Sequence, residues 1–257
     1  MSDQKAWLAW SSGKDAAWAL HVVRTRKVAA IVGLLSTVTA PYARVSMHGV
    51  RETVLEAQAE ALGLPIHRVY IPAPCSNEAY EAAMRQALAS ARAAGVNVIV
   101  FGDIALADVR AWREAHLARV GMSALFPLWQ GDTRALAREM ISAGLRAYVT
   151  CLDPRRVPRA LAGRRFDDAF LAALPAEADP CGENGEFHTC VVDGPMFRHP
   201  VAVRVGVTVE REGFVFTDLE LVAPVSETTG ATDARGDCLP MAKGGTHGQG
   251  EDVGRGT

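Results

Sequence analysis

The chain has 257 residues, of which 49% are hydrophobic and 22% are charged, and its formal net charge is −2. This composition is typical of a globular protein and excludes the strongly basic surface of many nucleic-acid-binding proteins. Apolar runs stay shorter than the roughly 20 residues of a membrane-spanning helix, and the N-terminus lacks the apolar core of a signal peptide. We therefore expect no nucleic-acid partner and no membrane partner.

The five cysteines are widely spaced, and no two of them form a Cys-x-x-Cys pair. No group of cysteines and histidines has the spacing of a zinc site either. The odd number and wide separation favour reduced thiols, as in a cytoplasmic protein. The sequence leaves the oligomeric state open, a homodimer included.

A polar turn, Trp10-Ser11-Ser12-Gly13-Lys14-Asp15, follows an apolar segment and precedes apolar residues at helical spacing. A tight turn between a strand and a helix points backbone N–H groups at one spot, and the helix dipole adds positive charge there. Lys14 adds a mobile positive charge suited to a phosphate. We therefore predict an anion site at this turn, with a plain turn and a solvated helix start as the alternative.

This turn is not a Walker A loop. A Walker A loop needs a glycine five residues before Gly13, where this chain has Leu8, and a serine or threonine where it has Asp15. A carboxylate at that place would repel a bare phosphate unless a metal ion or Lys14 offsets its charge. We therefore expect the turn to bind a metal–nucleotide complex in a manner different from that of a Walker NTPase.

Apolar runs alternate with amphipathic helices over the first 120 residues. Strands are predicted at residues 6–10, 28–36, 65–71 and 96–101, with helices after residue 16 and at 49–63, 76–95 and 108–120. Strands that are apolar on both faces and are joined by helices form parallel sheets. We therefore predict a doubly wound α/β domain over residues 1–122, with a mainly parallel sheet.

Residues 123–225 are predicted to form a smaller α+β lobe that packs on this domain. Its expected elements are a helix capped by Asp132, a strand at 146–152, a helical region opened by Asp153-Pro154, a helix that Pro175 ends, and a hairpin at 201–223. The last segment, 226–257, is rich in glycine, threonine and aspartate and is predicted to be a disordered tail.

Polar residues gather at the predicted strand ends. Ser11, Ser36, His48 and Asp103 all fall at or just after such ends. In doubly wound sheets, ligands bind beyond the carboxyl ends of the strands. This convergence favours a ligand site over a set of unrelated surface residues.

A second polar cluster lies in the segment 179–189, which is predicted to be irregular. Glu183 and Glu186 stand three residues apart, and glycines at positions 182 and 185 permit sharp bends close to a substrate. Two carboxylates in a partly enclosed loop could bind an amine or ligate magnesium. An acidic surface loop is the alternative, and we favour a site.

Together these motifs resemble one family. Ser11-Ser12-Gly13-Lys14-Asp15 resembles the SGGKDS loop of the PP-loop (N-type) ATP pyrophosphatases, also called adenine nucleotide alpha hydrolases. The segments VSMHGVR (45–51), FGDI (101–104), FPLW (126–129) and GENGEFHT (182–189) resemble the diphthine–ammonia ligase group within that family. The last segment is the most specific of the four, and the resemblance covers roughly residues 5–223.

The resemblance implies a Rossmann-like fold of the HUP type and an ATP-dependent ligase that forms a C–N bond. In that chemistry a carboxylate attacks the α-phosphate of ATP, pyrophosphate leaves, and ammonia displaces AMP from the acyl-adenylate. The implied partners are ATP, Mg²⁺, ammonia and a carboxylic acid, which is either a small molecule or a protein side chain.

The resemblance also implies roles for individual residues. The implied ATP-binding residues are Ser11, Ser12, Gly13, Lys14, Ser36, Thr37 and Gly102, and the implied magnesium ligand is Asp15. The implied catalytic residues are Lys14, Asp15, Asp103, Glu183 and Glu186. The implied substrate-binding residues are His48, Arg51, Asn184, His188 and Thr189.

Two positions depart from the family's loop. Ser12 stands where glycine is usual, and Ala16 replaces the closing serine and so removes one hydroxyl from the phosphate site. The second departure leaves a nucleotide-binding sensor without turnover as an alternative function. A PP-loop tRNA-modifying enzyme is another alternative, disfavoured by the net charge and by the missing Cys-x-x-Cys pair.

Overall fold

The structure is a computed structural model that describes residues 4–222. The tail predicted at 226–257 lies outside the described residues. These described residues form one compact unit. None of the helices in residues 4–222 combines the length and the apolar character that a membrane crossing requires.

Strands and helices alternate through the first 125 residues. They are β1 (Lys5–Ala9), α1 (Lys14–Arg26), β2 (Ala30–Thr39), the 3-10 turn η1 (Ala40–Tyr42), β3 (Arg44–Val45), α2 (Glu52–Leu62), β4 (Ile66–Ile71), α3 (Asn77–Ala93), β5 (Val98–Val100), α4 (Ala107–Arg119) and β6 (Ser123–Leu125). The chain continues with α5 (Thr133–Ser142), β7 (Arg146–Leu152), the 3-10 turn η2 (Arg159–Leu161), α6 (Asp168–Ala173), β8 (Phe187–Asp193), β9 (Val203–Arg211) and β10 (Phe214–Leu221).

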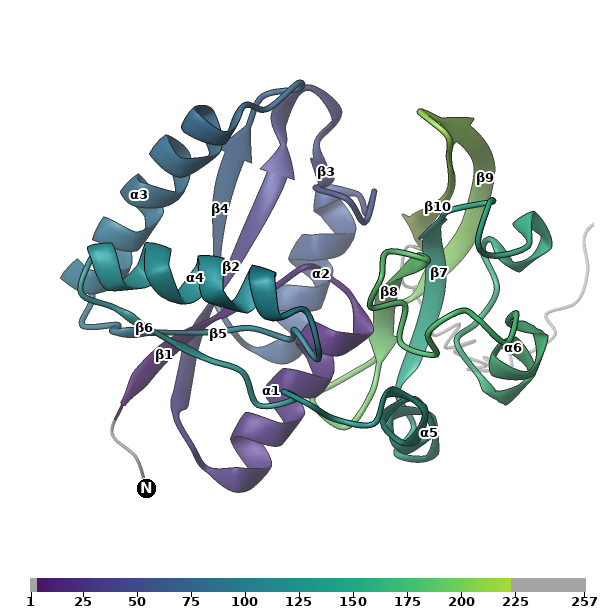
Figure 1. Ribbon diagram of the computed structural model, residues 1–257, viewed down its shortest axis with the longest axis horizontal. Coiled ribbons are helices and arrows are strands. Elements are labelled where there is room, and N and C mark those ends of the chain that lie inside the picture. Colours follow the sequence, from purple (N-terminus) through teal and green to yellow (C-terminus); the bar gives the residue numbers. More distant parts are fainter. Residues whose placement is uncertain (1–3, 223–257) are drawn as a thin grey trace, which may run out of the picture. The chain divides into compact units, whose positions relative to one another are not determined.

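The first sheet is mainly parallel. Its strand order is β3-β2-β1-β5-β6, with β4 also paired to β2, and within the described residues the short β3 is its antiparallel member (Figure 1). Successive side chains of a strand point to opposite faces, so Leu8 packs with α1 and α2, while Trp7 packs with α3 and α4. Helices therefore cover both faces of the sheet, and the predicted doubly wound α/β fold is confirmed.

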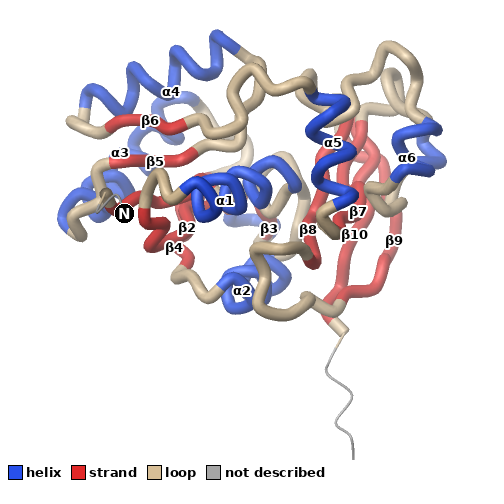
Figure 2. Tube along the Cα trace, turned by 90° about the horizontal axis from the view of Figure 1, so that it is seen from below, coloured by secondary structure: helices blue, strands red, loops and turns tan. Residues whose placement is uncertain are grey.

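The second sheet is antiparallel and has the strand order β8-β7-β10-β9. Its β9–β10 hairpin turns at Glu212-Gly213, as predicted. Figure 2 shows α1 between β5 and β6 on one side and the strands β7 to β10 on the other. The division of the chain at residue 122 stays a prediction.

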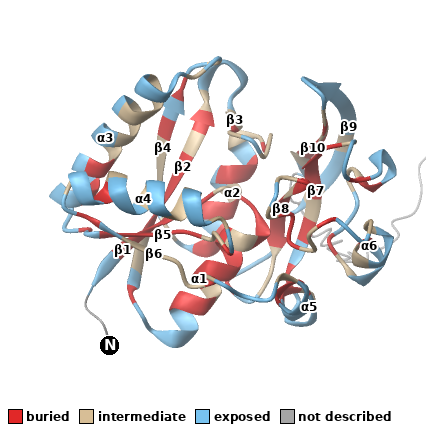
Figure 3. Cartoon of the chain, in the orientation of Figure 1, coloured by how far each residue is buried: buried red, intermediate tan, exposed pale blue. Residues whose placement is uncertain are grey.

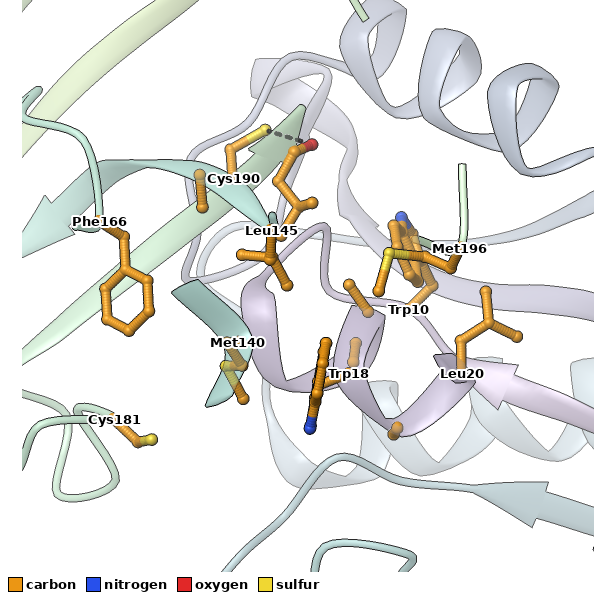
Figure 4. Close-up of a cluster of buried hydrophobic side chains, with 14 of the residues drawn as sticks. Trp10, Trp18, Leu20, Met140, Leu145, Phe166, Cys181, Cys190 and Met196 are labelled. Atoms are coloured by element: carbon orange, nitrogen blue, oxygen red, sulfur yellow. Dashed lines mark hydrogen bonds between the residues drawn. The ribbon is translucent and has the colours of Figure 1, made fainter. Parts of the chain in front are cut away.

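One apolar core joins the two sheets. α1 is buried over most of its length (Figure 3), because its alanines, Trp18 and Leu20 pack in a cluster that also holds residues of the second sheet. Trp18 and Leu20 lie in this cluster with Leu145, Cys190 and Met196 (Figure 4). The loop that precedes α1 is therefore placed where the two sheets meet.

Three features of the local structure differ from the prediction. β6 (Ser123–Leu125) was not predicted, and it pairs with β5 in the first sheet. The irregular segment ends before Phe187, because β8 begins there and pairs with β7. Asp153-Pro154 opens a turn rather than an α-helix, and the Asp153 carboxylate accepts the N–H of Arg155.

Two further element bounds differ from the prediction. β2 continues to Thr39, so Ser36 lies inside the strand and not at its end. α2 begins at Glu52 rather than at Gly49, because Gly49 has a φ of +67° and Arg51 has an extended backbone. The predicted caps at Ser76 and Asp132 are confirmed, since both side chains accept backbone N–H groups of the following turn.

Candidate active site

A cavity of about 700 Å³ lies beyond the carboxyl end of β1. Its wall comes from the turn after β1, residues 35 and 37 of β2, residues 45–48, the chain that follows β5 and most of residues 181–189, with further side chains from α3 and α4. The volume is in the usual range of small-molecule sites. Both clusters singled out in the sequence therefore face one cavity.

The backbone of the turn after β1 makes two hydrogen bonds to the second sheet. The N–H of Lys14 donates to Oγ1 of Thr189 at 3.1 Å, and the N–H of Val191 donates to the carbonyl of Ser12 at 2.8 Å. Ser12 has a φ of +69°, a conformation that favours glycine. β8 thus fixes the start of α1 through one side chain and one backbone group.

Lys14 is not the mobile cation that the sequence predicts. Its side chain is 2% exposed, and its Nζ donates to both carboxylate oxygens of Asp15, at 2.9 and 3.0 Å, and to the carbonyl of Cys181. The rings of Phe166 and Phe187 lie 5.6 and 5.3 Å from the same Nζ. Burial lowers the pKa of Lys14, but the charge and hydrogen bond of Asp15, together with the charges of Cys181 and Glu183, outweigh it, and the net shift is upward.

Asp15 lies on the cavity wall with 27% of its side chain exposed. Burial raises the pKa of this carboxyl more than the Lys14 ammonium lowers it. No group of three or more histidine, cysteine, aspartate or glutamate side chains suited to a metal ion occurs within residues 4–222. Magnesium needs only one or two carboxylates when phosphate oxygens complete its ligands, so Asp15 fits a magnesium ion that is bound together with a nucleotide.

Gly102 and Asp103 form the wall beside the start of α1. A Cβ atom on Gly102 would lie 2.7 Å from the carbonyl carbon of Asp15 and 2.8 Å from the backbone nitrogen of Ala16, so a side chain does not fit there. The Asp103 carboxylate pairs with the Arg113 guanidinium, with 3.0 Å between Nε and Oδ2. Asp103 is thus held in place by α4.

Glu183 reaches the cavity from the loop at 179–186. Its Oε2 accepts the N–H of Ile104 at 3.1 Å and that of Ala105 at 3.0 Å. Burial is the largest influence on Glu183 and, with the charge of Asp15, raises its pKa. The carboxylate therefore connects the 179–186 loop to the chain that follows β5.

Glu186 does not line the cavity, contrary to its predicted catalytic place. It is 3% exposed and accepts the backbone N–H groups of Asp179 at 3.2 Å and of Asn184 at 2.9 Å. Asn184 also donates its side-chain amide to this carboxylate, and Asn184 itself lines the cavity. Glu186 therefore shapes the loop from inside.

His48 and His188 stand side by side on the cavity wall, with 4.6 Å between their ring centres. Nδ1 of His48 lies 3.0 Å from the carbonyl oxygen of Thr189. Burial lowers the pKa of His48 to about 4, and burial together with His48 lowers the pKa of His188 to about 3. Both imidazoles are therefore neutral near pH 7.

The other predicted residues divide between the cavity and the interior. Ser11 and Thr37 line the cavity, together with Thr189. The side chains of Ser12 and Ser36 are buried instead. Arg51 does not line the cavity, because its guanidinium pairs with Asp218 in the β9–β10 hairpin.

Several lining residues were not predicted as part of a site. They are Met47 and Ser46 before α2, Tyr80 and Met84 of α3, and Leu106 and Arg113 near and in α4. Tyr80 and Met84 stand four residues apart, a spacing that by itself indicates only one face of a helix. Arg113 gave no signal, because its role depends on the position of Asp103.

Fold and cavity define an α/β protein with a cavity at the carboxyl end of a parallel strand, where such folds bind their ligands. Residues 4–124 match the diphthamide synthase N-terminal domain, and residues 132–221 match the diphthamide synthase C-terminal domain. The chain therefore belongs to the diphthamide synthase family, and the resemblance seen in the sequence is confirmed.

A named relative agrees with this family. The chain is 28% identical over 113 residues to a protein of Schizosaccharomyces pombe named diphthine–ammonia ligase. The match covers 42% of this chain and 19% of that protein. This chain thus spans about a fifth of the relative's length.

Proposed function

We propose that the chain is an ATP-dependent ligase that adenylates a carboxylic acid, releases pyrophosphate and transfers ammonia to the acyl group. The family and the name of the relative support a ligase. The observation that carries the proposal is that the turn before α1 and the carboxylates of Asp15, Asp103 and Glu183 face one cavity.

ATP would lie with its pyrophosphate portion at the start of α1. Backbone N–H groups and the helix dipole at this end favour a departing anion. The backbone beside Leu35 and Thr37 would hold the adenine, and Gly102 would leave room for the ribose or the α-phosphate. Magnesium, held by Asp15 and the phosphates, would offset the charge that develops on the leaving group.

The acyl transfer would take place between Asp103 and Glu183. The acid's oxygen forms a bond to the α-phosphorus while the bond to pyrophosphate breaks. Ammonia then forms the C–N bond while the C–O bond to AMP breaks, and it gives up a proton. Glu183 is the base that we assign to this proton, because its raised pKa brings the carboxylate closer to the range in which it can accept one.

Product analysis tests this function. Wild-type protein would be incubated with ATP, Mg²⁺, ¹⁵N-ammonium and a small-molecule extract, and in parallel with a protein extract as the acceptor. We expect AMP and pyrophosphate in equal amounts and ¹⁵N in one acceptor. Glu183→Gln should lower the rate by about a hundredfold or more, while Glu78→Gln, on the exposed start of α3, should not.

Two outcomes would contradict the proposal. ADP and phosphate as products would show that ATP is cleaved between its β- and γ-phosphates and not at the α-phosphate. Tight ATP binding without pyrophosphate release in either extract would favour a nucleotide sensor.

A further inference from the structure

Gln58 is a buried polar residue of α2 that the proposed chemistry does not use. It is 0% exposed. Its Oε1 accepts the indole N–H of Trp10 at 3.0 Å, and its Nε2 donates to the carbonyl of Val191 at 2.6 Å and to that of Ser12 at 3.3 Å. An indole N–H can only donate and a carbonyl can only accept, so these partners determine which way the amide points.

These contacts act on the peptide bond between Ser12 and Gly13. Its carbonyl accepts two hydrogen bonds on one side, from Gln58 Nε2 and from the N–H of Val191. The C=O and N–H of a trans peptide point in opposite directions. The N–H of Gly13 therefore points away from Gln58, toward Oγ of Ser11 at 3.4 Å.

Gly13 is itself buried, but two side chains next to it belong to the cavity wall. Ser11 lines the cavity, and so does His48, whose Cε1 would lie 2.7 Å from a Cβ atom on Gly13. Ser12 keeps its φ of +69° in this arrangement, although an L-residue pays roughly 1–2 kcal/mol for that conformation. Fixed partners for the Ser12 carbonyl offset this cost.

We propose that Gln58 is a positioning residue that holds the Ser12–Gly13 peptide so that the Gly13 N–H faces the bound pyrophosphate group. This inference rests on the proposed function, because it takes the turn before α1 to be the pyrophosphate site. Gln58 contacts no reacting atom. It acts through the backbone of the turn, and it ties that backbone to α2 and β8 at once.

The first test compares Gln58→Met with Val54→Ala. Methionine has a similar length and no amide, whereas Val54 is a fully buried residue of the same helix that takes no part in these hydrogen bonds. In the absence of any ligand, the ¹H–¹⁵N resonance of Gly13 should shift in Gln58→Met and stay in place in Val54→Ala. This measurement needs no ATP binding, so it tests the backbone role separately from the proposed function.

The second test measures affinity by calorimetry. Losing one well-aimed N–H to an anion should weaken the binding of ATP and inorganic pyrophosphate by roughly tenfold to a hundredfold in Gln58→Met. The affinity for adenosine should stay unchanged, because adenosine has no phosphate. Val54→Ala should keep all three affinities at the wild-type level.

Gln58→Glu gives an independent variant. An ionised carboxylate at this position would face two carbonyl oxygens, whereas a protonated carboxyl can donate to one of them. Burial raises a glutamate pKa, so ATP affinity should recover as the pH falls from about 8 to about 6 in this variant and not in Gln58→Met.

Three outcomes would overturn the inference. They are an unshifted Gly13 resonance in Gln58→Met, a parallel loss of ATP and adenosine affinity, and equal losses in Gln58→Met and Val54→Ala. A wild-type protein that binds neither ATP nor pyrophosphate would instead overturn the proposed function, while the Gly13 resonance would still decide the backbone role.

Discussion

Ser12 is a serine in a backbone conformation that suits glycine. Its φ is +69°, and among the described residues its buried Oγ has no hydrogen-bond partner. Ser12→Gly removes both the strain and the unpaired hydroxyl, while it loosens the unfolded chain. We expect the free energy of unfolding to rise by about 1 kcal/mol, measured by urea titration.

Ser11→Gly is the matched control. Ser11 is not among the residues with positive φ, so glycine relieves no strain there. It adds flexibility and removes the Oγ that faces the Gly13 N–H, and it should lower the free energy of unfolding by about 0.5–1 kcal/mol. A Ser12→Gly variant that is destabilised as much as Ser11→Gly would contradict the argument.

The neutral pair of His48 and His188 predicts a loss of stability in acid. Their folded pKa values of about 4 and about 3 lie below the value of about 6.5 in the unfolded chain. The unfolded chain therefore takes up protons first as the pH falls. This contribution to stability is complete above about pH 6.5 and is lost as the pH falls toward 4, by up to about 1.4 kcal/mol per pH unit for each histidine.

Urea titrations between pH 7 and pH 4.5 measure this change in the free energy of unfolding. In His188→Gln, the free energy of unfolding should fall less steeply with falling pH, because one of the two titrating histidines is gone. His199→Gln, at an exposed site, should leave this pH dependence unchanged. Equal slopes in wild type and His188→Gln would show that the pair does not titrate as argued.

At this scale the sequence predicts which residues come together better than it predicts what they do. Lys14 and Asp15 were expected at a phosphate site, and they do line the cavity. That Lys14 is a buried cation next to two phenylalanine rings depends on Phe166 and Phe187, which lie more than 150 residues further on. Spacing within one segment cannot show such a contact.

Among the elements, the β9–β10 hairpin is held beside β3 and the start of α2 by carboxylates of β10, chiefly that of Asp218. Asp218 accepts hydrogen bonds from Arg51 Nε at 3.0 Å and from Arg44 Nη1 at 2.9 Å. Burial alone would raise the pKa of Asp218, but the two guanidinium groups outweigh it and lower this pKa to about 2. This stabilisation is therefore present above about pH 4 and is lost as the pH falls toward 2.

Asp218→Asn should lower the free energy of unfolding at pH 7 by about 1.5 kcal/mol, as measured by urea titration. The value is modest because Arg51 is 42% exposed. Glu210→Gln, whose partner Arg159 is 54% exposed, should change the free energy by less than about 0.5 kcal/mol. Equal effects of the two substitutions would refute the proposed anchor.

Elements with their own periodicity and caps were predictable, whereas those that depend on a distant partner were not. Ser76 and Asp132 cap helices as expected, because a cap is a local hydrogen bond. β6 has three residues and β8 begins inside a polar segment, so each becomes a strand only by pairing with a neighbour. Hydrogen bonds to another strand leave no local pattern in a short segment.

In the molecule as a whole, the site exists because two sheets meet over one helix. The parallel sheet and its strand ends followed from the alternation of strands and helices. The place of the second sheet did not, because it is fixed by contacts between β8 and the start of α1, such as Thr189 with Lys14. The family resemblance supplied that connection where the residue pattern could not.

Lys14 of α1 contacts the loop at Cys181, and so it joins the part of the chain with the first sheet to the part with the second sheet. Its removal tests whether these two parts unfold together. Lys14→Met would leave the Asp15 carboxylate and the Cys181 carbonyl without this cation. We expect the free energy of unfolding to fall by about 2 kcal/mol, less than for a fully buried pair because Asp15 is partly exposed. Lys27→Met, at an exposed helix end, should change it by less than about 0.5 kcal/mol.

Two probes report on the two parts of the chain in the same urea titration. All five tryptophans lie in residues 7–129, whereas Cys151, Cys181 and Cys190 are buried in the second part and can be labelled only after they open. Because one apolar core spans both sheets, tryptophan fluorescence and cysteine labelling should give the same midpoint in wild type and should move together in Lys14→Met. Labelling that precedes the fluorescence change would show that the second sheet unfolds alone, so that Lys14 and the shared core do not couple the two parts.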